Sequence, residues 1–107
     1  MKRIILLILI VSFVKGTYAQ SKLGDILFDN FEYELAAKYY KNADSLNNNQ
    51  LKKHALCFYF NNDFHKAIPL FEKAIDQDSS NLFLKYHYAI SLKSTGRYIS
   101  AKKVFNG

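Results

Sequence analysis

One pattern of aromatic and alanine residues occurs three times along this sequence. Residues 33–43 and 64–74 both read aromatic-x-x-Ala-x-x-x-aromatic-x-x-Ala, and residues 98–105 repeat its first part. Spacings of three and four residues put the aromatic and alanine side chains on one face of a helix. The first alanines of successive copies are 31 and 34 residues apart. A chain with such a period folds as a row of similar units, each burying its apolar face against the next.

A further apolar helix is expected before each copy of the pattern. It carries a small residue three positions before a large one, so that two helices can approach closely while the large side chain fills the groove between them. We expect these residues and those of the pattern to make the contacts within and between helix pairs. They are Gly24, Leu27, Tyr33, Ala36, Tyr40, Ala43, Ala55, Phe58, Phe64, Ala67, Phe71, Ala74, Ala89, Leu92, Tyr98, Ala101 and Phe105.

The sequence therefore predicts an all-α fold, with Asn, Asp and Ser clusters between the helices because these side chains favour turns and helix starts. Ser79 and Ser80 are expected to cap a helix. Pro69 lies inside a helix, where it removes a backbone donor, and Gly96 is expected to end a helix in a left-handed conformation. The expected helices are at about 21–29, 33–45, 49–60, 64–77, 81–94 and 98–107.

The period and the motif resemble the tetratricopeptide repeat, whose second helix carries this pattern at intervals of about 34 residues. The resemblance covers nearly all of residues 21–107 and implies a right-handed solenoid of antiparallel helix pairs, with two full repeats and a truncated third. Asn48 and Ser79 stand where a proline usually follows the second helix, and the first linker is three residues short. The expected domain is 20–107, with repeats at about 21–47, 48–80 and 81–107.

The N-terminus has the features of a secretory signal. Two basic residues precede an apolar run over residues 4–14, which suits a signal of about 7–15 apolar residues and falls short of the roughly 20 that span a bilayer. Small residues at Thr17 and Ala19 fit a signal peptidase site, so we expect residues 1–19 to be a signal peptide cleaved after Ala19. An uncleaved anchor remains the alternative, because Lys15 separates the apolar run from that site.

Charge argues against a nucleic-acid partner. The chain has 15 Lys and Arg against 9 Asp and Glu, but residues 20–107 keep only 12 of the basic residues, mixed with all nine acids. Such a mixture makes a solvated surface and not a basic footprint. We therefore expect no nucleic acid, and membrane contact only through the signal segment or a larger assembly.

The C-terminal end of the sequence falls inside the last expected helix and leaves the inward face of Val104 and Phe105 uncovered. Solenoids normally end in a capping helix, so we expect either the front of a longer protein, which we favour, or a second copy that covers this face. Residues 24–33, GDILFDNFEY, resemble the front of an exported envelope family in which tetratricopeptide repeats precede a β-propeller and an OmpA-like peptidoglycan-binding domain. That resemblance implies a periplasmic or outer-membrane-associated scaffold, although the later domains are not in this sequence.

Residues able to do chemistry are few. His54 and Cys57 lie three apart on one expected helix and share a face, which leaves open a small metal or redox site as an alternative. No second pair completes a zinc site, and no glycine-rich loop cradles a phosphate. We therefore expect no enzyme, no cofactor and no metal.

Binding is the expected function. In proteins that this chain resembles, the first helices of successive repeats line a concave groove, to which Asp25, Phe28 and Asp29 would belong by position. Aromatic side chains flanked by Lys suit an extended or helical peptide with an acidic group, although packing between repeats explains each aromatic equally well. The expected groove residues of the second and third repeats are Lys52, Leu56, Tyr59, Phe60, Phe83, Tyr86, Ile90 and Lys93.

The carboxylate-gripping version of this fold holds Lys and Asn on its first groove helix. Ser21 and Asp25 occupy those positions here, so that function is not implied. The sequence thus predicts an exported, non-catalytic protein–protein interaction module of the cell envelope with a protein or peptide partner. The alternative is a purely structural spacer.

Overall fold

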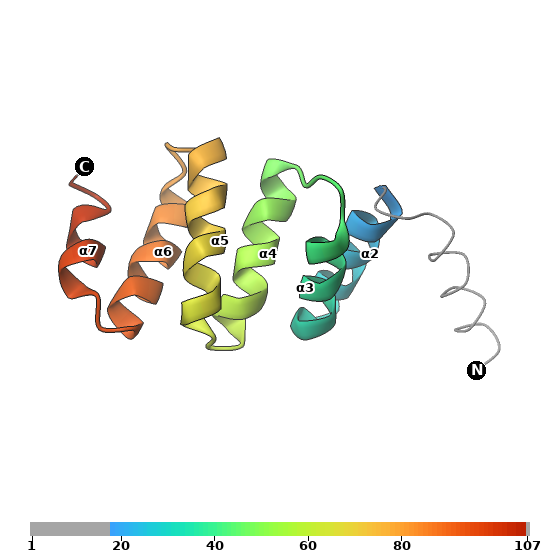
Figure 1. The fold of residues 1–107 in the computed structure, drawn as a ribbon, viewed down its shortest axis with the longest axis horizontal. Coiled ribbons are helices and arrows are strands. Elements are labelled where there is room, and N and C mark those ends of the chain that lie inside the picture. Colours follow the sequence, from blue (N-terminus) through green and yellow to red (C-terminus); the bar gives the residue numbers. More distant parts are fainter. Residues whose placement is uncertain (1–17, 107) are drawn as a thin grey trace.

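Six α-helices follow one another through residues 18–106, the part of the chain that this computed structural model describes. Figure 1 shows the helices following one another along the long axis of the molecule, with α2 partly behind α3 and with consecutive helices antiparallel. The predicted all-α fold of helix pairs is therefore confirmed, and no strand occurs among these residues. The helices are α2 (Tyr18–Asp29), α3 (Tyr33–Asn42), α4 (Asn48–Phe60), α5 (Phe64–Gln77), α6 (Leu82–Ser94) and α7 (Tyr98–Lys103).

The predicted signal peptide, residues 1–19, lies almost wholly outside the described residues. Its last two residues fall in the first turn of α2. None of the helices between residues 18 and 106 is long and apolar enough to cross a membrane.

The same turn joins the two helices of every pair. Phe31, Asn62 and Gly96 each have a positive φ, of 63°, 60° and 83°. The amide of the following residue then donates to a carbonyl in the last turn of the first helix, the hydrogen bond by which a left-handed residue ends a helix. These bonds are Glu32 N to Leu27 O at 2.9 Å, Asp63 N to Phe58 O at 2.8 Å and Arg97 N to Leu92 O at 2.8 Å. The left-handed turn predicted at Gly96 is confirmed, and it recurs at two residues that are not glycine.

Asparagine and aspartate side chains start three of the helices. Asn47 forms a capping box with Gln50 at the start of α4, and the side chain of Asp63 accepts from the Lys66 amide in α5. Asn81 accepts from the Leu84 amide of α6. The prediction that Ser79 and Ser80 cap this helix is wrong: both lie in the preceding turn, because the residue directly before α6 is Asn81.

The helix α3 is four residues shorter than α5, the second helix of the next pair. It ends at Asn42 and not at residue 45 as predicted, since Ala43 takes an extended conformation with ψ of 142°. The first two copies of the repeat are only 31 residues apart, and α4 still has to begin with an extended cap at Asn47. The last turn of α3 is therefore lost.

The prediction that Pro69 lies inside a helix is confirmed, whereas the predicted length of the last helix is wrong. Pro69 does not interrupt α5, which continues to Gln77 with the proline on its exposed side. The helix α7 stops at Lys103 and continues only as a turn, where residues up to 107 were predicted to be helical.

Small residues of the first two helix pairs lie at the centre of the fold. Ala36, Ala55 and Ala67 are completely buried, and beside them the rings of Tyr40 and Phe71 are at most 1% exposed. Two core clusters result, one within α3 and α4 and one that joins α4, α5 and α6. These small residues and rings pack closely between neighbouring helices.

The third pair packs less tightly than predicted. Tyr98 and Phe105 are expected to be packing residues, but their side chains are 64% and 53% exposed. The helix α7 has only six residues and packs mainly against α6, so its aromatic positions have little to lie against.

Gly24 lets the Tyr40 ring of α3 lie close against α2. It is buried in α2 with the ring of Tyr40 directly against its Cα, and a β-carbon placed on it would lie 2.6 Å from Cε1 of Tyr40. That distance is too short for a real contact, so glycine is required here by packing and not by backbone conformation.

Replacement of Gly24 by alanine is expected to destabilise the protein by about 1–3 kcal/mol, because overpacking of the Tyr40 ring outweighs the better helix propensity of alanine. Urea unfolding followed by circular dichroism measures this loss. In a Tyr40→Leu background the same replacement should cost much less, since the ring is gone. Equal losses in both backgrounds would contradict the proposed contact.

Candidate partner-binding groove

The first helices of the three pairs lie next to one another. α2 contacts α4, and α4 contacts α6, in addition to the contacts that each makes with its sequence neighbours. The residues predicted to form a groove therefore lie on adjacent helices, those of the second repeat on α4 and those of the third on α6.

A lysine and an aromatic ring connect α4 and α6. The ammonium of Lys52 lies 5.2 Å from the ring centroid of Phe83, within the range of a cation–π contact. Phe83 is 45% exposed, and Tyr86, three residues further along α6, is 57% exposed. Lys93 is exposed on the same helix, and Ile90 is half-buried. This surface presents apolar and cationic groups together.

Two of the predicted groove residues, Leu56 and Tyr59, pack against neighbouring helices beneath this surface. Leu56 is only 4% exposed and belongs to the core that joins α4, α5 and α6. Tyr59 is half-buried, with its ring edge-on to Phe64 at 5.6 Å and to Phe71 at 6.0 Å. Both side chains pack between helices, and Leu56 is almost completely buried.

His87 lies among the aromatic rings of this surface, although it is not one of the residues predicted to line the groove. Its ring centroid is 4.1 Å from that of Phe83, 4.9 Å from that of Tyr59 and 5.2 Å from that of Tyr86. The Nδ1 atom is 2.8 Å from the carbonyl oxygen of Phe83, which assigns the ring proton to Nδ1. Its position four residues after Phe83 and beside Tyr86 is the signal in the sequence that points to it.

Lys53 of α4 contacts the three first-repeat residues of the predicted groove, Asp25, Phe28 and Asp29. Its ammonium lies 3.8 Å from Oδ1 of Asp25 and 3.9 Å from Oδ1 of Asp29, and it stands 5.6 Å from the ring centroid of Phe28. The Asp29 side chain is 70% exposed and still faces solvent. The Asp25 side chain is only 27% exposed.

Asp25 connects three helices. It accepts a hydrogen bond from the Tyr40 hydroxyl of α3 at 2.6 Å and another from Nε2 of Gln50 in α4 at 3.0 Å. Burial, and then the hydrogen bond to the Asp25 carboxylate, raises the pKa of the Tyr40 phenol well above its ordinary value, so the hydroxyl remains a donor. Asp25 therefore links α2, α3 and α4.

A second group of aromatic rings lies where α2 and α4 end. The centroids of Phe28 and Tyr33 are 5.4 Å apart, and those of Tyr33 and Phe60 are 5.1 Å apart. Phe60, a predicted groove residue, is 45% exposed, and Phe31 in the turn is 78% exposed. These rings extend the aromatic surface toward the first repeat.

His54 and Cys57 do not form a reactive pair. Cys57 is 1% exposed, and burial raises the pKa of its thiol to about 12, so the thiol stays protonated at neutral pH. Burial, and then the charges of Lys73 and Lys41, lowers the pKa of His54 to about 4. Within residues 18–106 there is no group of three or more His, Cys, Asp or Glu side chains that could hold a metal ion.

Comparison with known protein families agrees with the pairwise packing of the helices. The tetratricopeptide-repeat family model matches residues 18–50, which span α2, α3 and the start of α4. A search of curated proteins gave no match. The chain thus contains a tetratricopeptide repeat in an all-helical fold of sequential antiparallel pairs. Repeats of this kind are generally protein–protein interaction scaffolds and are typically non-catalytic.

The neutral state of His54 gives folding stability a pH dependence. Its unfolded pKa is about 6.5 and its folded pKa about 4, so the unfolded state binds the proton more readily. Stability is fully present above pH 6.5 and is expected to fall by about 1–3 kcal/mol between pH 6.5 and 4, after allowance for the ring's partial solvent contact. The titratable groups around the ring are Tyr40, Lys41, Asp44 and Lys73.

Urea unfolding at pH 7 and pH 4.5 measures this effect as a difference between variants. His54→Gln should lose less stability on acidification than the unsubstituted protein. His65→Gln, on the exposed surface of α5, is the matched control and should behave like the unsubstituted protein. An unchanged pH dependence in His54→Gln would contradict the assignment.

Proposed function

We propose that this chain is an exported interaction module of the cell envelope, in which the face formed by α4 and α6 docks a protein or peptide partner. The proposal rests on the tetratricopeptide repeat matched in residues 18–50 and on the groups that α4 and α6 expose. Export is supported by the signal pattern of residues 1–19, and the envelope by the resemblance of residues 24–33. The front of a longer outer-membrane-associated protein remains the favoured setting.

The observation that carries the docking proposal is the pairing of exposed rings with lysines. Phe83 and Tyr86 are about half exposed although both are large and apolar, and Lys52 and Lys93 lie on the same two helices. Burial of such rings against a partner contributes most of the binding energy in typical interfaces, while the lysines favour an acidic group nearby. A peptide with apolar anchors and a carboxylate fits this surface.

A spacer without contacts of its own is the second candidate. Its support is that Leu56 and Tyr59, two residues of the predicted groove, serve the packing of the helices. The two candidates differ in one respect, since only a docking module has a partner resting on Phe83 and Tyr86.

Site-specific photocrosslinking in the cells that produce the protein separates the candidates. A photoreactive residue at Phe83 or Tyr86 is expected to give one discrete crosslinked product, because a bound partner excludes water from these side chains. Leu82 and Ile99 are matched controls, since both are apolar and at least 70% exposed but neither lies on the predicted groove. Crosslinks of equal yield at all four positions, or at none, would favour the spacer.

The envelope assignment has a separate test in the N-terminus of the mature protein. Mass spectrometry of envelope fractions is expected to find a product that begins at Gln20, because the peptidase site ends at Ala19. Retention of residues 1–19 in a membrane fraction would support the anchored alternative. A product confined to the cytoplasm would exclude export and leave the docking proposal to the crosslinking result.

A further inference from the structure

A second groove, of about 370 Å³, lies between α6 and α7, and we call it the terminal groove. Figure 1 shows these two helices at one end of the molecule, with α2 and α3 near the other. The rings of Tyr98 and Phe105 are 64% and 53% exposed in the terminal groove, which is lined by apolar side chains, tyrosines and two lysines. Its lining residues are Tyr86, Ala89, Ile90, Lys93, Tyr98, Ala101, Lys102 and Phe105.

The spacing of the repeat shows which kind of element fits the terminal groove. Four residues of this groove lie 34 positions after four members of the core cluster that joins α4, α5 and α6. Those four members are at most 4% exposed, because α6, the first helix of the next pair, packs on them through Leu84. The terminal groove therefore corresponds to a surface that the first helix of a further pair covers. The matching residues are Ala55 and Ala89, Leu56 and Ile90, Ala67 and Ala101, and Phe71 and Phe105.

α2 is a first helix with an uncovered face. Counted from the small residue that each first helix carries, Leu23 and Ile26 of α2 correspond to Tyr88 and Ser91 of α6. In α6 these positions face the preceding pair, since the Tyr88 hydroxyl donates to Glu72 of α5 at 2.9 Å and Ser91 is completely buried. No helix precedes α2 among residues 18–106, so Ile26 is 54% exposed and Leu23 is only half-buried.

The two ends of the molecule also differ in charge. Residues 79–107 contain five Lys and Arg and no Asp or Glu. Residues 20–47, which include α2 and α3, contain five Asp and Glu against three Lys. The end that carries the terminal groove is thus basic, and the end that carries the uncovered face of α2 is acidic, so opposite ends of two copies attract each other.

We propose that copies of this chain associate head to tail, with α2 of one copy in the terminal groove of the next. Leu23 and Ile26 then pack against Tyr98 and Phe105, in the way that α6 packs on α4 and α5 within one chain. A further helix of a longer chain would also cover the terminal groove, but it would leave Ile26 exposed. A second copy covers both surfaces with one contact.

Sedimentation velocity of the purified mature protein at increasing concentration tests this association. The contact joins two different surfaces, so each complex keeps one uncovered α2 and one open terminal groove. The weight-average mass is therefore expected to rise with concentration and to pass that of a dimer. A monomer at every concentration, or a mass that stops at that of a dimer, would overturn the proposal.

Two single replacements each block one of the surfaces. Ile26→Lys places a cation against the lysines of the terminal groove, and Phe105→Lys removes one of its rings. Each is expected to weaken association at least about tenfold, as for the loss of an apolar anchor. Both side chains are more than half exposed, so both variants should fold, which thermal unfolding checks. Ile99→Lys is the matched control, since Ile99 is 75% exposed on α7 but does not line the terminal groove.

A mixture of the two blocked variants tests the direction of the contact. Each variant keeps the surface that the other has lost, so an equal mixture is expected to form a dimer and nothing larger where each variant alone is a monomer. No dimer in the mixture, or equal weakening by Ile99→Lys, would contradict the head-to-tail contact. Neither Ile26 nor Phe105 belongs to the candidate partner-binding groove, so the crosslinking result at Phe83 tests the docking proposal independently.

Discussion

The approach of α2 to α3 depends on one contact between a glycine and an aromatic ring. Gly24 has no side chain, so the ring of Tyr40 can lie against α2 and be buried. Only from this position does the Tyr40 hydroxyl reach Asp25, which also holds Gln50 and Lys53 of α4. The same contact that closes the first pair therefore also connects it to the second.

In the later repeats alanines take the place of the glycine and let the helices approach. These alanines are less buried toward the C-terminal end. Ala55, Ala67 and Ala74 are at most 2% exposed between α4 and α5, whereas Ala89 and Ala101 of the third pair are only half-buried. The exposed rings on α4 and α6 are supported by the buried residues that join α4, α5 and α6. A docking surface requires such a support, because side chains that are already ordered lose less conformational entropy on binding.

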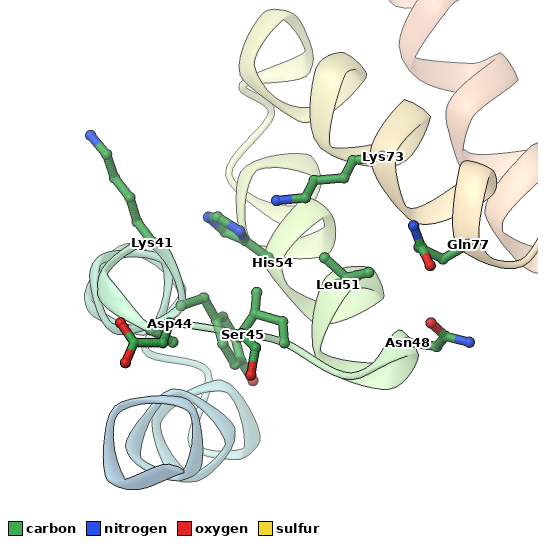
Figure 2. Close-up of a pocket in the computed structure, with 11 residues that line it drawn as sticks. Lys41, Asp44, Ser45, Asn48, Leu51, His54, Lys73 and Gln77 are labelled. Atoms are coloured by element: carbon green, nitrogen blue, oxygen red, sulfur yellow. The ribbon is translucent and has the colours of Figure 1, made fainter. Parts of the chain in front are cut away.

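The candidate groove and a pocket of about 480 Å³ beside His54 arise from different parts of the repeat. The groove uses the first helices, where the exposed rings of Phe83 and Tyr86 surround His87. The pocket uses the second helices, where the shortened α3 leaves space beside His54 (Figure 2). A regular repeat would also form the candidate groove. The pocket beside His54 forms only because the first linker is short.

The helices, their pairing and most of the buried small residues were predictable from the sequence, because helix periodicity and the spacing of small and large residues act locally. The tetratricopeptide repeat that the family model matches in residues 18–50 was predictable from the same spacing. The side chains that face a partner were not predictable, since Leu56, Tyr59 and Phe60 share one helix but their exposure depends on α5 and α6. His87 gained the rings around it only when α4, α5 and α6 met. Tertiary packing decided which of the large side chains were buried and which stayed exposed.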